Sequence, residues 1–218
     1  MVRPAAAGAV LGLALALGVP AAWQLTREPA AVGAPVGQVL PAPVSPGRPP
    51  SSAGPPTAVP TRAAAPTAAA VPAPVRLAVP ALGVDAPVDP VGVRADGLMQ
   101  LPDDVDRVGW YRFGPVPGAD GSAVVAGHVD DRDQGLGVLA PLREAAVGDE
   151  IVVTDVTGAA THWRVVSREL IAKQALPLDR LFSRAGPPRL VLVTCGGPFL
   201  PEHGGYRDNL VVVAEPER

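Results

Sequence analysis

The chain has 218 residues, of which 18 are basic, 21 are acidic, 28 are proline and one is cysteine, and its net charge is −3. Residues 1–74 carry four arginines and one glutamate, a net charge of +3, whereas residues 75–218 carry 14 basic and 20 acidic side chains, a net charge of −6. The C-terminal part is acidic overall, whereas nucleic-acid binding needs a basic surface, so we expect no nucleic-acid partner. The single cysteine excludes an internal disulfide.

Residues 1–28 predict an N-terminal transmembrane anchor. The uncharged, mainly apolar run from Ala5 to Trp23 is about long enough to cross a hydrocarbon core about 30 Å thick. A cleaved signal peptide is the alternative, because Val19–Ala22 offers small residues near a plausible cleavage point, but the apolar run is longer than the usual signal core. Either segment predicts export. We therefore expect a single-pass cell-membrane protein that contacts the membrane through residues 4–26, with the rest of the chain on the extracytoplasmic side.

Residues 29–74 have the composition of a disordered linker. Thirteen of these 46 residues are proline, and most of the others are small or polar. Such a segment cannot bury enough apolar surface to fold by itself, and proline stiffens it toward polyproline II at about 3.1 Å per residue. We expect a spacer that lifts the following domain away from the membrane, with a proline-rich partner-binding motif as the alternative.

Residues 75–218 predict one all-β domain with short helices, large enough to bury a core. Short apolar runs alternate with Pro, Gly and Asp, a pattern that favours strands joined by turns. Short helices are expected at Asp103–Val108 and Leu176–Phe182. Eight strands indicate a barrel or a sandwich, and their number alone does not separate one small barrel from another. The expected strands are Arg76–Val79, Ala86–Val91, Leu98–Leu101, Ala123–Ala126, Glu150–Asp155, Thr161–Leu170, Leu190–Thr194 and Asn209–Ala214.

The cysteine lies at the end of a predicted strand, in the stretch Arg189–Gly197. The run from Leu190 to Val193 indicates a buried strand, which ends at Cys195 and two glycines. Glycines at this place would let a substrate backbone approach the thiol closely, so Cys195 is a candidate nucleophile. The alternative is that Cys195 is a small buried hydrophobic residue, as free cysteines often are.

Three histidines could serve as the partner of this cysteine. His128 follows the apolar run Ala123–Ala126, so it emerges at a strand end as Cys195 does. His162 lies within a predicted strand on a face that we expect to be solvated. His203 lies in the loop after Cys195. From the residues alone, His128 and His203 are nearly equal candidates, because the partners of a catalytic cysteine are brought together by the fold.

Several short motifs of the chain resemble those of one protein family. One motif is LVTC, which ends at Cys195, and another is YRDN at 206–209, the start of the next strand. A third is AGH at 126–128, which is part of the segment AVVAGHVD at 123–130. The segment VGWYR at 108–112 precedes it. In them the chain resembles the sortases, which are cysteine transpeptidases, and most of all the class F sortases of actinobacteria. The resemblance covers about residues 75–215 and implies an eight-stranded sortase-type β-barrel. Val191 stands where the family signature TLxTC usually has threonine, which bears more on the class than on the chemistry.

The resemblance implies Cys195, His128 and Arg207 as the catalytic residues. Attack on a carbonyl needs a thiolate, departure of an amine needs a proton, and the oxyanion formed between the two steps needs positive charge or hydrogen-bond donors. Cysteine, histidine and arginine supply these in turn. Thr194 resembles the family residue beside the oxyanion site, close to the substrate. Without the resemblance, Arg207 could simply be a surface partner of Asp208.

The resemblance also implies substrates and partners. We expect cleavage of an LPxTG-like sorting signal of secreted proteins between Thr and Gly, a thioester on Cys195, and transfer to an amine of a peptidoglycan precursor, by a monomer without cofactor or metal. Asp130, Asp131 and Asp133 could bind calcium, but a solvated loop is the simpler interpretation. The alternatives are another cysteine transpeptidase of the cell wall, such as an L,D-transpeptidase, and a non-enzymatic wall-binding or interaction barrel with an inert buried cysteine.

Overall fold

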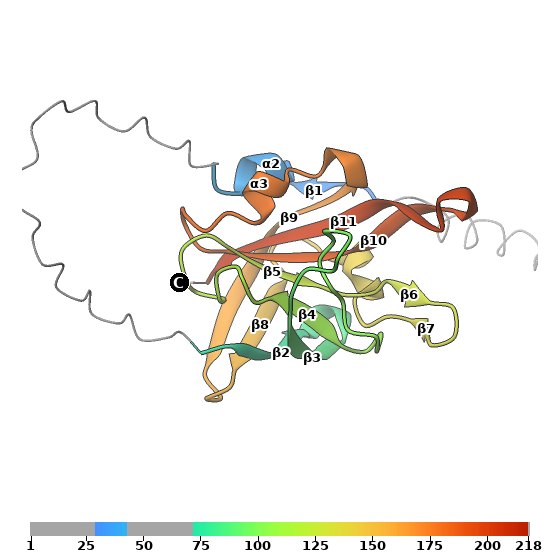
Figure 1. Ribbon diagram of the computed structural model, residues 1–218. Coiled ribbons are helices and arrows are strands. Elements are labelled where there is room, and N and C mark those ends of the chain that lie inside the picture. The colour runs from blue at the N-terminus through green and yellow to red at the C-terminus, as the bar shows by residue number, and fades with distance from the viewer. Residues whose placement is uncertain (1–28, 43–71, 218) are drawn as a thin grey trace, which may run out of the picture. The chain divides into compact units, whose positions relative to one another are not determined.

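The computed structural model describes residues 29–42 and 72–217. Eight strands of the second range form a sheet in the order β9-β11-β10-β5-β4-β3-β2-β8, and the pairing of β8 with β9 closes it into a barrel (Figure 1). Pairs β3–β4 and β5–β10 are parallel, and the other pairs are antiparallel. The predicted all-β class and eight-stranded barrel are confirmed. The strands are β2 (Pro74–Val79), β3 (Val84–Val91), β4 (Val108–Tyr111), β5 (Ser122–Ala126), β8 (Glu150–Asp155), β9 (Ala160–Ala172), β10 (Arg189–Leu200) and β11 (Gly205–Pro216).

Shorter elements decorate the barrel. A small separate hairpin, β6 (Asp130–Asp131) with β7 (Gly135–Leu136), follows β5. The predicted helix at Leu176–Phe182 corresponds to α3 (Leu178–Leu181). The 3₁₀ turns are Pro80–Leu82, Ala140–Glu144, Lys173–Ala175 and Pro201–His203.

Residues 92–101 form a loop, so the predicted strand Leu98–Leu101 is wrong. Val93 and Met99 make an isolated bridge, and the N–H of Arg94 donates to the carbonyl of Leu98 at 2.8 Å, which closes the loop on itself. Leu98 is 63% exposed. Met99 packs against a cluster of buried apolar residues, but the run pairs with no strand of the barrel, so apolar composition alone does not make a barrel strand.

The strand that replaces it in the barrel is β4, and the predicted helix Asp103–Val108 is wrong. The Asp104 carboxylate accepts a hydrogen bond from the N–H of Asp106 at 2.9 Å, and the Asp104 carbonyl accepts one from the N–H of Arg107 at 3.2 Å. Aspartate here folds the backbone into a tight turn instead of capping a helix. Val108 and Trp110 are then buried in the core, where an extended chain with alternating side chains places them.

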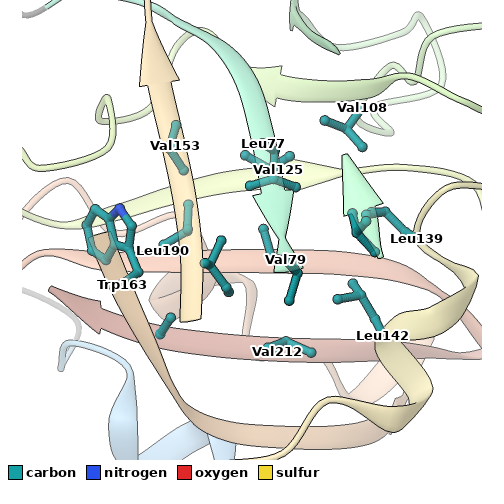
Figure 2. Packing of buried hydrophobic residues seen from close by; sticks show 14 of the residues in the cluster. Leu77, Val79, Val108, Val125, Leu139, Leu142, Val153, Trp163, Leu190 and Val212 are labelled. Atoms are coloured by element: carbon teal, nitrogen blue, oxygen red, sulfur yellow. The ribbon is translucent and has the colours of Figure 1, made fainter. Parts of the chain in front are cut away.

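Strand alternation sorts the buried apolar side chains into two clusters on opposite faces of the sheet. The inner cluster fills the barrel, and Figure 2 shows members such as Leu77, Val125 and Trp163 packed together. On β10, Leu190 and Leu192 belong to the inner cluster, whereas Val191 belongs to the outer one. The outer cluster consists of Val36, Leu40, Val124, Leu181, Val191, Val211 and Val213.

Residues 31–42, hereafter the strap, pack on the outer cluster. Within the strap, β1 (Val32–Gly33) pairs with β9, and α2 (Val36–Val39) lies beside α3 (Figure 1). The N–H of Val36 donates to a carboxylate oxygen of Glu169 at 2.8 Å, and the Arg189 guanidinium donates to the carbonyl of Val39 at 2.8 Å. The prediction of a disordered linker over 29–74 did not include this docking, because it considered what the segment buries by itself and not the apolar face it could cover.

In the described ranges, 29–42 and 72–217, none of the helices is long and apolar enough to cross a membrane. The anchor predicted for residues 1–28 and the middle of the predicted linker, residues 43–71, lie outside the described residues.

Candidate active site

The parallel pairing of β5 with β10 carries Cys195 and His128 to the same edge of the barrel. Val193 pairs with Ala126, and the N–H of Gly127 donates to the carbonyl of Val193 at 3.1 Å. Cys195 and His128 each lie two residues beyond that last pair. Since neighbouring parallel strands end at the same edge, the thiol and the imidazole emerge there together, although their segments are far apart in the sequence.

Cys195 is half-buried on the outer face of the barrel. It follows Val191 and Val193 at alternate positions of β10, so its side chain points to the same side as the outer cluster. Burial raises the pKa of the thiol above its ordinary value. The ammonium of Lys173 opposes this rise and the carboxylate of Asp130 adds to it. The thiol is therefore neither fully buried in the core nor freely solvated.

His128 is held by its backbone and by one ring nitrogen. Its Nε2 lies 3.0 Å from the carbonyl oxygen of Pro102. A carbonyl can only accept, so this bond assigns the proton to Nε2, and Nδ1 is left as the nitrogen that gains and loses a proton. Gly137 backs directly onto His128, because a Cβ at position 137 would overlap the His128 carbonyl.

Arg207 lies near the start of β11, the strand that pairs with β10, and is bound by its own neighbour Asp208. Its Nε and Nη2 donate to the two carboxylate oxygens of Asp208 at 2.8 and 2.7 Å. The Asp208 side chain is only 4% exposed, whereas that of Arg207 is 46% exposed. The Asp208 pairing considered from the sequence therefore exists, but the carboxylate is buried, so the pair fixes the plane of the guanidinium at the edge of the site.

The glycines after Cys195 serve the protein's own packing. Gly197 has φ = 72°, and a Cβ there would overlap the Asp208 carboxylate; a Cβ at Gly196 would lie 2.8 Å from Leu170 Cδ1. Glycine is needed here because Asp208 and Leu170 approach the chain too closely for any side chain.

Thr194 is 3% exposed and lies on the opposite face from the thiol. It pairs with Leu210, a member of the inner cluster, so its hydroxyl points into the barrel. Among the described residues that hydroxyl has no hydrogen-bond partner. Any contribution of Thr194 to an oxyanion site therefore has to come from its backbone.

Three residues around the site were not identified as site residues from the sequence: Asn209, Tyr206 and Lys173. Asn209 pairs directly with Cys195 across β10 and β11. The Tyr206 hydroxyl donates to the Asp130 carboxylate, which raises the pKa of Tyr206 to about 12 and ties β11 to the segment after His128. Lys173 directly follows β9, the strand that pairs with β11. The sequence contains one sign that Lys173 is unusual, namely that it is the single lysine of the chain.

The other two histidines lie in different settings. His162 is exposed, as predicted, and its Nδ1 lies 2.7 Å from a Glu150 carboxylate oxygen. His203 ends the 3₁₀ turn between β10 and β11. Glu150, His162 and Glu217 have potential metal-ligating atoms within 4.8 Å of one another. All three are exposed, and the two carboxylates already pair with His162 and Arg164, so this group is explained as a surface ion-pair network.

The acidic residues after His128 form a turn. The Asp131 carboxylate accepts hydrogen bonds from the N–H groups of Asp133 and Gln134 at 2.9 and 3.0 Å, and these bonds lower its pKa. Asp130 is engaged by Tyr206. The structure thus gives Asp130 and Asp131 partners within the protein.

Comparisons with known proteins agree with the fold. A model described as a sortase domain matches residues 77–217. Sortase A of Listeria monocytogenes is 22% identical, with a TM-score of 0.51 over 67% of this chain and 88% of that chain. The lid mutant of Corynebacterium diphtheriae sortase A is 16% identical, with a TM-score of 0.50 over 66% and 69% of the two chains. Streptococcus agalactiae sortase C1, solved in complex with MTSET, is 20% identical, with a TM-score of 0.50 over 66% and 68%. A comparison with curated proteins gave no match.

Proposed function

The chain belongs to the sortase family of cysteine transpeptidases, and we propose that it cleaves an LPxTG-like sorting signal between Thr and Gly and transfers the acyl group to a cell-wall amine. The observation that carries this proposal is the arrival of Cys195 and His128 at one edge of the barrel, two residues beyond the same pair of a parallel ladder. Arg207 stands on the adjoining strand of the same site.

In the first half-reaction the thiolate of Cys195 attacks the carbonyl carbon of the threonine. The C–N bond to glycine breaks, and the departing nitrogen takes a proton from Nδ1 of His128, because Nε2 is engaged with the Pro102 carbonyl. The products are a thioester on Cys195, a free amine on the released segment and a neutral imidazole.

In the second half-reaction an amine of a peptidoglycan precursor attacks the thioester. Nδ1 of His128 takes the proton of the incoming amine, an amide bond forms, and the sulfur leaves as thiolate. In both half-reactions negative charge develops on the carbonyl oxygen. Arg207 supplies positive charge for it, with the guanidinium plane set by Asp208, and a cation fixed beforehand costs little reorganisation in the transition state.

The cellular setting is part of the proposal. Residues 1–28 would anchor the chain as a single membrane pass, with the barrel on the extracytoplasmic side, where secreted proteins with sorting signals and peptidoglycan precursors are present. The motifs quoted above favour class F of the family. Protease protection in sealed and opened cells would test this orientation: the barrel should be cleaved from outside without opening the membrane.

The chemistry is tested by intact mass. The full chain is incubated with an LPxTG-type peptide, with and without a short glycine peptide as the amine, and Cys195→Ala is the control. We expect an adduct of the acyl mass on the parent chain that disappears into ligated peptide when the amine is added, and no adduct on the folded alanine variant. Absence of any adduct across related motifs and pH values, or an active alanine variant, would overturn the proposal.

A further inference from the structure

The side chain of Gln134 joins the hairpin that follows His128 to the loop that contacts the ring of His128. Gln134 lies in the turn of the β6–β7 hairpin. Its Nε2 donates to the carbonyl of Asp103 at 2.9 Å, and its Oε1 accepts from the N–H of Val105 at 3.3 Å. Asp103 directly follows Pro102, whose carbonyl oxygen lies 3.0 Å from Nε2 of His128. The amide is therefore bound one residue away from the carbonyl that contacts the imidazole.

These hydrogen bonds complete a closed ring of contacts around His128. The β6–β7 hairpin begins two residues after His128 and returns beside it, because the N–H of Gly137 donates to the carbonyl of Val129 at 2.9 Å. The hairpin thus fixes the backbone of His128, and the Pro102 carbonyl fixes its ring. Gln134 links the hairpin to the loop that carries Pro102. An imidazole supported in this way from both sides keeps one orientation.

Neither of the two turns that Gln134 connects uses its amide for closure. The Asp131 carboxylate closes the hairpin turn by accepting from the N–H groups of Asp133 and Gln134. The Asp104 carboxylate closes the loop turn by accepting from the N–H of Asp106. Gln134 is exposed, so water could satisfy its amide without any loss of side-chain freedom. Its two hydrogen bonds therefore serve the connection between the segments.

We propose that Gln134 is a positioning residue for the reaction, whose amide keeps the Pro102 carbonyl against Nε2 of His128. The inference rests on the proposed function for its role in catalysis. With the Nε2 proton held by a carbonyl, Nδ1 is the nitrogen that protonates the departing amine and deprotonates the incoming one. If the carbonyl moves away, the neutral ring can carry its proton on either nitrogen, and part of the enzyme then presents the wrong tautomer.

The test is ¹⁵N NMR of the imidazole nitrogens in the full chain at about pH 8.5, where ordinary histidines are neutral. We expect the parent to show His128 with its proton on Nε2 alone. Gln134→Met keeps the length of the side chain without the amide, so it should show both tautomers. His162 is the reference in the same spectra, because its Nδ1 lies 2.7 Å from a Glu150 carboxylate oxygen and should keep the opposite tautomer in every variant.

Ligation kinetics with an LPxTG-type peptide give the functional readout. We expect Gln134→Met to lower kcat about three- to tenfold, the effect of losing a hydrogen bond between neutral groups, and to leave KM near the parent value. Gln134→Glu keeps the acceptor for Val105 but loses the donor to Asp103, so it should show both tautomers as well. Gln38→Met is the matched control, because Gln38 is an exposed glutamine of the strap, and it should match the parent in both measurements.

A single Nε2 tautomer of His128 in both Gln134 variants would overturn the proposal. Both tautomers with a parent-like kcat would also overturn it, and so would a changed His128 tautomer in Gln38→Met, because the effect would then not follow the amide of Gln134. The NMR measurement needs no sorting signal, which separates this inference from the proposed function. Mixed tautomers in the Gln134 variants, with no ligation by the parent chain, would keep Gln134 as the residue that positions His128 and would remove the sorting-signal chemistry.

Discussion

At the scale of single residues, Gly197 supports the site by making room for Asp208. Alanine at position 197 would have to adopt φ = 72° and would overlap the Asp208 carboxylate. We expect Gly197→Ala to displace the buried carboxylate from Arg207 and to lower the free energy of unfolding by about 2–4 kcal/mol. Transpeptidation should fall as well, because the guanidinium loses its fixed plane. Urea unfolding and ligation kinetics of the full chain measure the two effects.

Gly204 provides the matched control for this prediction. It lies in the connection between β10 and β11 and also has a positive φ, 63°, but a Cβ there meets nothing within 4 Å. Gly204→Ala therefore carries the conformational cost alone, about 1 kcal/mol. If the two variants lost equal stability and activity, the contact between Gly197 and Asp208 would have no role in the site.

The same residues show what the sequence could reveal at this scale. Cys195 was recognisable because a strand pattern ended on the single cysteine, and Arg207 because a second strand opened with it. The purpose of the glycines was not recognisable. Their missing side chains leave room for Asp208 and Leu170, and those contacts exist only after β10, β11 and β9 have paired.

At the scale of elements, the Tyr206–Asp130 hydrogen bond joins the β10–β11 hairpin to the β6–β7 hairpin. The first hairpin carries Cys195, and the second follows directly after His128. Tyr206 also stacks edge-to-face on Phe199, with ring centroids 5.3 Å apart. The aromatic ring is therefore held within its own hairpin, and the hydroxyl alone reaches across to the other.

Tyr206→Phe should keep the ring packing and break the connection between the hairpins. We expect faster amide hydrogen exchange around residues 128–136 and a roughly three- to tenfold lower kcat, as a lost hydrogen bond of 0.5–1.5 kcal/mol to a catalytic segment allows. Asp130→Asn is the contrasting variant, because an amide oxygen can still accept from Tyr206 while the negative charge near Cys195 is gone. Asp130→Asn should lower the midpoint pH of Cys195 alkylation and leave amide hydrogen exchange around residues 128–136 near the parent rate. Unchanged exchange in Tyr206→Phe would contradict the connection.

The pairing of elements also explains which strand predictions failed. Residues 98–101 and 108–111 are both short apolar stretches, and only the first was predicted to be a strand. In the structure the second joins the barrel, because β4 pairs with β3 and β5 and buries Trp110, whereas Leu98 remains exposed. The convergence of His128 and Cys195 on one edge of the barrel likewise needed the parallel pairing of β5 with β10, which links segments distant in the sequence.

At the scale of the whole described unit, the strap is a part of the predicted spacer that packs on the barrel. Residues 31–42 dock on the barrel and residues 74–79 form one of its strands, so residues 43–71 connect two parts of one unit. Proline-rich composition predicted that this region would not fold alone, and that reasoning gave no information about docking. The relevant signal is the spacing of Val36 and Leu40, four residues apart on one side of the strap, and its meaning depends on an outer cluster that forms only in the folded barrel.

Docking of the strap depends on Val36, which is fully buried among Val124, Leu181 and their neighbours. A carboxylate at this place would be buried without a cationic partner, which costs several kcal/mol, more than so short a segment can offset. We therefore expect Val36→Asp to release the strap: amides of residues 32–40 should exchange at nearly unprotected rates, and protease should cut within residues 29–42, while the inner cluster keeps the barrel folded. Gln38→Ala, an exposed position of the same helix, should behave like the parent chain. Because the strap and Cys195 share the outer face of β10 and β11, the alkylation profile of Val36→Asp then measures how far this packing supports the thiol. Parent-like protection of residues 32–40 in Val36→Asp would show that the backbone bonds to Glu169 and Arg189 hold the strap without its apolar contact.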